Sequence, residues 1–187
     1  MTAAPSSLLV LGGARSGKSR HAVAAVRALG GRVAVVATAE PLDPDMAARI
    51  CRHRNERPPS WLTVEEPIEL VETLRRLGDT ADTVLVDCLT LWVANHLQRG
   101  VTDEAIVAHG ETLAKLVGER PYSLVLVSNE VGQGVHPETA AGLRFRELLG
   151  LVNQAVAREA DRVVLMVAGL PLTVKDQIPH EQAPEAP

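Results

Sequence analysis

The sequence is poor in aromatic residues, since Trp, Tyr and Phe together make up 2% of its 187 residues. It also has no excess of positive charge: the formal net charge is −4, and no stripe of Lys and Arg is interleaved with aromatic residues. Proteins whose main partner is a nucleic acid usually carry such a basic patch. These two deficits argue against nucleic acid as the main partner.

Cysteine is scarce as well, and Cys51 and Cys88 lie far apart, outside any closely spaced metal-binding pair. We expect two neutral thiols in a reducing compartment rather than a disulfide. No apolar run approaches the length of a membrane span, and Met1–Ser7 lacks the basic start and apolar run of a signal peptide. The sequence therefore predicts a cytoplasmic protein with no membrane span.

One stretch near the amino end carries the clearest motif. Four apolar residues, Leu8–Leu11, run into Gly12-Gly13-Ala14-Arg15-Ser16-Gly17-Lys18-Ser19, which has the spacing of a phosphate-binding P-loop. Gly12 and Gly17 allow backbone conformations that a Cβ forbids, so that successive amides point at phosphate oxygens. Lys18 supplies positive charge for the outer phosphates and the Ser19 hydroxyl can hold Mg²⁺. The helix that begins here adds its free amides and positive end.

Apolar strands alternate with helical patterns along the chain. Strands are expected at 8–11, 32–37, 61–65, 83–86, 124–127, 163–167 and, weakly, 172–175; helices are expected at 19–29, from Pro44 past His53, and at 67–77, 89–97, 103–117 and 138–160. This alternation predicts an α/β fold with a three-layer, doubly wound and mostly parallel sheet. Residues 8–175 are expected to form a single nucleotide-binding catalytic domain, between a flexible N-terminus, 1–7, and a disordered tail, 176–187.

Polar residues follow several predicted strands at their carboxyl ends, where open α/β sheets bind ligands. Asp87 ends the run Val84-Leu85-Val86, from which a carboxylate reaches the metal ion of a P-loop site; the alternative is a helix cap. Glu65 can accept a base or ribose hydrogen bond or simply be solvated. Asn129 and Glu130 fit a site role and a turn-forming role equally well. His96, His109 and His180 are expected at the surface.

Arginines cluster around His53. Residues 49–57 contain Arg49, Arg52, Arg54 and Arg57, with Glu56 as the only carboxylate among them. Such a group of cations repels itself unless an anion shares the site, and it disfavours the imidazolium form of His53. A neutral imidazole beside arginines is suited to attack a phosphate and to hold the resulting phosphoramidate. A surface histidine with no function is the alternative.

In order and spacing, several of these segments resemble one protein family. They are the P-loop with Arg20-His21-Ala22, the run from Met46 to His53, Arg57-Pro58 before Trp61 and Glu65, Val86-Asp87-Cys88-Leu89-Thr90, Ser128–Gly132 and Val152-Asn153-Gln154. The family is the bifunctional adenosylcobinamide kinase/adenosylcobinamide-phosphate guanylyltransferases of cobalamin biosynthesis. The resemblance covers residues 8–175 and implies a RecA-like P-loop NTPase fold and a homotrimer.

The resemblance implies two reactions. ATP or GTP phosphorylates adenosylcobinamide, and GMP then passes from GTP through a covalent guanylyl-histidine to adenosylcobinamide phosphate, giving adenosylcobinamide-GDP and pyrophosphate. By position, His53 is the guanylylated residue, assisted by Lys18, with Mg²⁺ at Ser19 and Asp87. Some members carry two adjacent histidines where this chain has Arg52-His53, which favours the second position as the nucleophile. The nucleotide-binding set that the resemblance implies is Gly12, Gly13, Ala14, Arg15, Ser16, Gly17, Lys18, Ser19, Ala37, Thr38, Ala39, Arg54, Asn55, Glu56, Arg57, Glu65 and Asp87.

Two other functions are compatible with the same residues. A P-loop kinase of a small alcohol or nucleotide uses the same phosphate site, with His53 only part of a substrate clamp. A nucleotide-dependent switch or motor subunit needs a partner-binding surface, for which the chain shows no additional module. Covalent labelling by GTP distinguishes guanylyl transfer from both.

Overall fold

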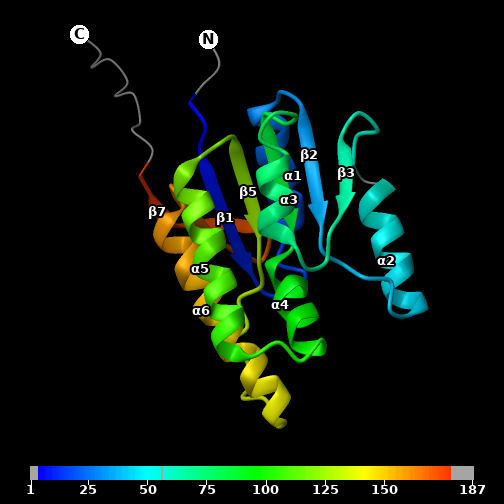
Figure 1. The fold of residues 1–187 in the computed structure, drawn as a ribbon, viewed down its shortest axis with the longest axis vertical. Coiled ribbons are helices and arrows are strands. Elements are labelled where there is room, and N and C mark those ends of the chain that lie inside the picture. The colour runs from blue at the N-terminus through cyan, green and yellow to red at the C-terminus, as the bar shows by residue number, and fades with distance from the viewer. Residues whose placement is uncertain (1–3, 56, 178–187) are drawn as a thin grey trace.

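The computed structural model describes residues 4–55 and 57–177, with the backbone alone at Arg49 and His53 (Figure 1). Seven strands form one sheet in the order β3-β2-β4-β5-β1-β6-β7. All neighbouring strands run parallel except β6 and β7, which are antiparallel. The predicted α/β fold with a mostly parallel sheet is thus confirmed. The strands are β1 (Ser7–Gly12), β2 (Val33–Ala37), β3 (Leu62–Glu65), β4 (Thr83–Asp87), β5 (Ser123–Val127), β6 (Arg162–Val167) and β7 (Leu170–Asp176).

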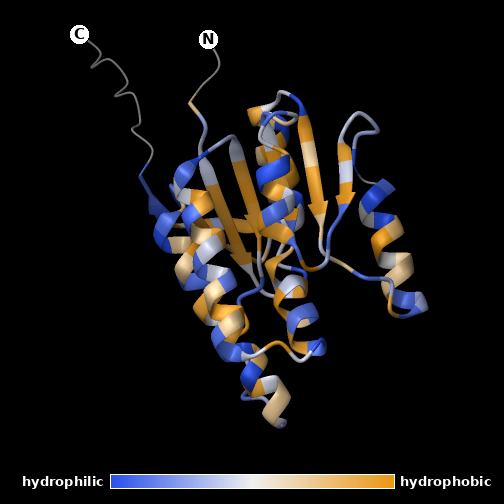
Figure 2. Ribbon diagram, viewed as in Figure 1, coloured by the Kyte–Doolittle hydropathy of each residue, from blue (hydrophilic) through white to orange (hydrophobic). Residues whose placement is uncertain are grey.

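Helices cover both faces of the sheet. On one face α1 buries Ala22 and Val26 against strand residues, and on the other α3, α4, α5 and α6 form the larger core. The central strands are apolar on both sides (Figure 2), as parallel strands between two helical layers must be. The helices are α1 (Lys18–Leu29), α2 (Pro44–Asn55), α3 (Leu70–Arg76), α4 (Leu89–Gln98), α5 (Asp103–Glu119) and α6 (Ala140–Glu159).

Side-chain caps set several helix starts. The Asp43 carboxylate accepts a hydrogen bond of 2.7 Å from the Met46 amide, so α2 begins at Pro44 as predicted. By contrast, α3 begins at Leu70 and not at 67, because the Glu66 carboxylate accepts the amides of Ile68 and Glu69 at 2.9 and 2.8 Å in a turn before it. The α2 helix lies apart from the other helices, beside β3 (Figure 1).

The two ends of the described chain meet at Asp161. Its carboxylate accepts the amide and hydroxyl of Ser7 at 2.8 and 2.9 Å and pairs with Arg120. Its carbonyl accepts the Gln177 amide at 2.9 Å. Ser7 and Asp176, from the stretches expected to be flexible, are therefore strand residues, whereas 178–187 lie outside the described residues.

One surface prediction is wrong. His96 is only 2% exposed, because α4 is apolar around most of its circumference and is enclosed by the sheet and neighbouring helices. His109 is exposed as predicted, and His180 lies outside the described residues. Within residues 4–55 and 57–177, the structure contains no helix with the length and apolar character of a membrane span.

Candidate active site

The loop from Gly12 to Gly17 joins β1 to α1 and has the backbone that the motif predicts. A Cβ at Gly12 would lie 2.4 Å from the Ser16 Oγ and 2.9 Å from the Met166 carbonyl oxygen. Gly17 has φ +94° at the N-cap of α1, in the left-handed region that favours glycine. The special need for glycine at these two positions is confirmed. At Gly13, a Cβ would meet no described atom within 4 Å.

Neighbouring segments hold the loop in place. The Glu130 amide donates to the Gly12 carbonyl at 3.1 Å, and the Gly169 amide donates to the Ser16 carbonyl at 3.0 Å. The Lys18 ammonium donates to the Gly13 carbonyl at 3.0 Å. The end of β5 and the turn between β6 and β7 thus support the phosphate loop. Sequence reasoning missed Gly169, whose only signal was a glycine two positions after the end of an apolar strand.

The first of two cavities, here called the P-loop cavity, measures about 630 Å³ and lies directly over this loop. Arg52 of α2 and Asn129, which follows β5, complete its wall. Four of its lining side chains are cationic, and no Asp or Glu is among the described residues that line it. Together with the free amides at the start of α1, this charge makes the cavity an anion site. The lining consists of Ala14, Arg15, Ser16, Gly17, Lys18, Ser19, Arg20, Arg52 and Asn129.

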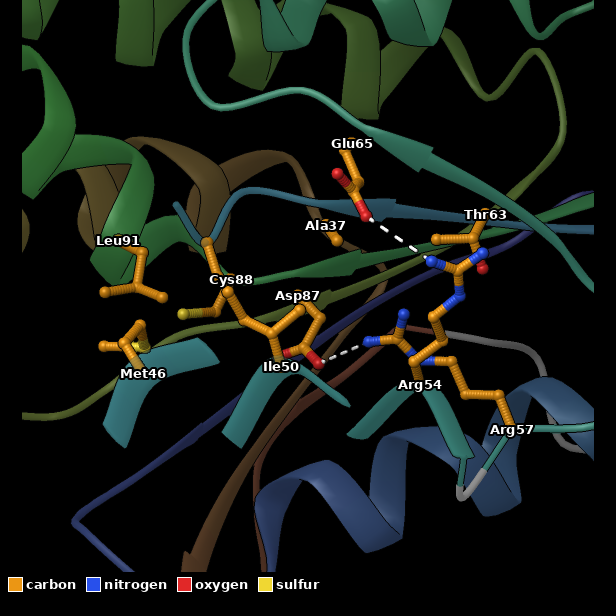
Figure 3. Close-up of a pocket in the computed structure, with 11 residues that line it drawn as sticks. Ala37, Met46, Ile50, Arg54, Arg57, Thr63, Glu65, Asp87, Cys88 and Leu91 are labelled. Atoms are coloured by element: carbon orange, nitrogen blue, oxygen red, sulfur yellow. Dashed lines mark hydrogen bonds and ion pairs between the residues drawn. The ribbon is translucent and has the colours of Figure 1, made fainter. Parts of the chain in front are cut away.

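The second, here called the strand-end cavity, lies where β2, β3 and β4 end beside α2 (Figure 3). A buried ion pair joins Arg57 Nη2 to Asp87 Oδ2 at 3.0 Å, with side-chain exposures of 8% and 18%. The cavity is small, about 50 Å³, room for water rather than a nucleoside. Its lining consists of Ala37, Ala39, Met46, Ile50, Arg54, Arg57, Thr63, Glu65, Asp87, Cys88 and Leu91.

Other charged and titratable groups of this cavity differ in burial. Arg54 Nη1 and Glu65 Oε1 face each other at 3.9 Å on the rim, with exposures of 67% and 63%. Burial, and then the negative charge of Asp87, raises the pKa of the Cys88 thiol to about 11. Cys88 is therefore a neutral wall residue and not a nucleophile. Both Cys51 and Cys88 are free thiols.

Thr38 lies between Ala37 and Ala39, which line the strand-end cavity, but it lines neither cavity itself. Its hydroxyl donates to the Cys88 carbonyl at 2.7 Å and accepts the Cys88 amide at 2.9 Å. Asn95 of α4 donates to the Thr38 carbonyl at 2.8 Å. Thr38 is fully buried, so it fixes the end of β4 instead of facing a ligand. Sequence reasoning missed Asn95, which is hidden in an apolar helix.

His53 belongs to α2, which contributes to the walls of both cavities. Arg52, directly before it, lines the P-loop cavity, whereas Arg54, directly after it, lines the strand-end cavity. Asn55 lines a further hollow together with Arg57 and Trp61. Glu56 lies outside the described residues.

The oxygen donors expected to hold Mg²⁺ are split between the cavities. The Ser19 residue lines the P-loop cavity and Asp87 lines the strand-end cavity. A hydroxyl and a carboxylate suit Mg²⁺, which also keeps water and substrate phosphate oxygens as ligands. Among the described residues, no three His, Cys, Asp or Glu side chains are grouped to hold a metal without such help.

Comparison with known proteins gives consistent matches. Residues 8–174 match the family model described as cobinamide kinase / cobinamide phosphate guanyltransferase. The chain is 43% identical to the bifunctional adenosylcobalamin biosynthesis protein CobP of Pseudomonas aeruginosa, over 90% of this chain and 97% of that protein. It is 38% identical to the protein CobU of the same description from Escherichia coli and 36% identical to that from Salmonella typhimurium, in each case over 90% of this chain and 99% of the relative.

Proposed function

Because the chain belongs to the cobinamide kinase / cobinamide phosphate guanyltransferase family, we propose that it is a bifunctional enzyme of adenosylcobalamin biosynthesis. It phosphorylates adenosylcobinamide with ATP or GTP, and it then transfers GMP from GTP to the phosphorylated corrinoid. The observation that carries this proposal is the cationic P-loop cavity whose wall is completed by Arg52, the residue next to His53. The family resemblance of the sequence motifs is confirmed by the family match.

Both reactions use the same phosphate site. The loop amides, the positive end of α1 and Lys18 bind the triphosphate, and they offset charge that develops on the departing phosphates. Arg15, Arg20 and Arg52 add positive charge around the same cavity. Ser19 and Asp87 would hold a magnesium ion, which would neutralise further phosphate charge when bound. In the kinase step the corrinoid hydroxyl oxygen attacks the terminal phosphorus, the bond from that phosphorus to the bridging oxygen breaks, the nucleoside diphosphate leaves and the hydroxyl proton passes to water.

His53 is the nucleophile of the transfer step. Its ring nitrogen attacks the α-phosphorus of GTP, so a nitrogen–phosphorus bond forms, the bond to the β-phosphate oxygen breaks and pyrophosphate leaves. A phosphate oxygen of the corrinoid then attacks the same phosphorus, and the histidine is released. The covalent intermediate divides one difficult transfer into two easier ones. The position of α2 between the two cavities supports this role.

The experiment that tests this function uses GTP labelled at the α-phosphate. We expect a covalent label that is acid-labile and alkali-stable, that is lost in His53→Ala and that persists in the matched control His136→Ala. His53→Ala should retain phosphorylation of adenosylcobinamide, whereas Lys18→Ala should weaken both reactions. Absence of label from the wild-type protein under all divalent-metal conditions would support a plain kinase. Hydrolysis stimulated by a macromolecule, without a corrinoid product, would support a switch or motor.

The proposed assembly is a homotrimer, in line with the family resemblance. Leu170, Leu172 and Val174 alternate along the edge strand β7 and are 71%, 57% and 62% exposed. Exposed apolar side chains on an edge strand favour association. Light scattering should give three times the 20.0 kDa mass of the chain, and a monomeric mass at micromolar concentration would contradict the proposal.

A further inference from the structure

A separate cavity of about 220 Å³ lies among α3, α4 and α5, on the face of the sheet opposite α1. We call it the α3–α5 cavity. Its apolar wall includes Leu70 and Trp92, and its polar wall includes His96, His109 and two carboxylates of the α3 region, Glu69 and Glu72. None of these residues lines the P-loop cavity or the strand-end cavity.

His96 is the unusual group in this wall. The residue is only 2% exposed, and neither ring nitrogen has a hydrogen-bond partner within the described part of the protein. The neighbouring polar groups are satisfied: Trp92 Nε1 donates to the Ile68 carbonyl at 2.8 Å, and the Thr112 hydroxyl donates to the Ala108 carbonyl at 2.8 Å. Buried polar atoms rarely lack a partner. The two nitrogens of His96 are therefore left for a partner that is not part of the protein.

A second imidazole lies beside the first. The rings of His96 and His109 have centroids 4.9 Å apart and planes inclined at 46°. Two histidines that bind one tetrahedral metal ion, with metal–nitrogen distances of about 2.0–2.1 Å, have ring centroids roughly 5 Å apart. The separation of the rings thus fits a shared ion. His109 is exposed, which gives such an ion a path from solvent.

The lining of the cavity also carries charge that suits a cation. Glu69 and Glu72 line the same cavity and add negative charge, although Arg75 partly offsets it. Because no three such residues are grouped as ligands in the part of the chain described, the imidazole pair supplies two ligands.

We propose that the α3–α5 cavity binds a divalent transition-metal ion, with Zn²⁺ as the probe, through ring nitrogens of His96 and His109. Water completes the coordination, and Glu69 and Glu72 add negative charge to the same cavity. The site is independent of the magnesium-assisted chemistry at the P-loop. It also adjoins the active site through α4: Leu91 lines the strand-end cavity, and Trp92, the next residue, lines this one.

The test is a zinc titration of the full chain by calorimetry, with excess Mg²⁺ present and with Cys51→Ser as the background, because Cys51 is an exposed free thiol. We expect one zinc ion per chain, and at least a tenfold weaker affinity in His109→Ala. The matched control is His136→Ala, which removes a histidine of an exposed loop and should leave the affinity unchanged. Cobalt(II) in place of zinc should give the visible absorption of a nitrogen-coordinated ion.

His109 is exposed and outside the active site, so His109→Ala should fold and should still be guanylylated at the wild-type rate. His96→Gln should show the same loss of zinc binding, provided that its near-ultraviolet circular dichroism is native. Zinc affinity that is equal in His109→Ala and the background overturns the proposal, as does a cobalt spectrum identical to that of the hydrated ion. Because zinc binding is measured apart from GTP labelling, either result leaves the proposed function untouched.

Discussion

The buried ion pair between Arg57 and Asp87 should stabilise the protein far more than the exposed pair between Arg54 and Glu65 does. The two side chains are 8% and 18% exposed, and their charged atoms are 3.0 Å apart. Removing one partner of a fully buried pair costs about 3–5 kcal/mol, since the other charge stays buried without it. Asp87 keeps some solvent contact and has a further interaction. For Arg57→Leu we therefore expect the free energy of unfolding to fall by about 2 kcal/mol.

The chain contains a matched control for this change. Arg54, in the last turn of α2, lines the same cavity and faces Glu65 at 3.9 Å, but both side chains are more than 60% exposed. Exposed pairs contribute about 0–1 kcal/mol, so Arg54→Leu should cost less than about 0.5 kcal/mol. Urea unfolding without nucleotide, at neutral pH and low salt, measures both variants under the same conditions.

A double-mutant cycle separates the pair from other effects of losing an arginine. Arg57→Leu combined with Asp87→Asn should show a coupling energy of about 1 kcal/mol or more, because the two groups are in contact. Equal losses in Arg57→Leu and Arg54→Leu would refute the reasoning. So would a cycle that is additive to within about 0.5 kcal/mol.

Three further changes give distinct outcomes. Gly12→Ala should abolish detectable binding of a fluorescent GTP analogue, because its Cβ would meet Ser16 Oγ at 2.4 Å, whereas Gly13→Ala should preserve binding; equal binding by both variants would contradict the steric argument. Arg120 holds the pKa of Asp161 at about 2, below the ordinary 3.8. The ionised carboxylate therefore adds about 2 kcal/mol to the free energy of unfolding above about pH 4, and this contribution is lost as the pH falls toward 2. Asp161→Asn should lower stability at pH 7 and flatten this acid dependence in urea titrations; an unchanged slope would count against it. Asn95→Leu removes the donor to two carbonyls and should cost about 2 kcal/mol in thermal unfolding, and an unchanged midpoint would rule that out.

Much of the fold is predictable from the sequence because its elements carry local signals. The apolar run before Gly12 predicts a buried strand, and the P-loop spacing predicts the turn and the helix after it. Strand order is different, since parallel strands buried on both faces have the same apolar pattern and do not reveal which neighbour they pair with. The predicted helix at 67–77 begins three residues too early. The Glu66 carboxylate holds a turn in front of α3, and the apolar pattern of the sequence does not reveal that turn.

The candidate site is predictable only in part. The P-loop residues follow from spacing, but the Arg57–Asp87 pair joins two side chains that no local pattern connects. Asp87 was expected at a metal ion, and its buried partner Arg57 becomes visible only in the folded chain, where the segment after α2 reaches the end of β4. His96 was expected at the surface because its neighbours in the sequence do not show that α4 is enclosed on several sides.

The strand order also governs how this chain can fold as it is made. The strand that leads into the phosphate loop, β1, leaves the ribosome first, yet both of its partners, β5 and β6, belong to the later part of the chain. Until they emerge, an apolar segment and its phosphate loop have no neighbours to pair with. Contacts that are so distant in sequence form slowly and leave intermediates prone to aggregation. A nascent chain arrested before β6 therefore lacks one of the two strands that pair with β1, however complete its phosphate-binding motif is.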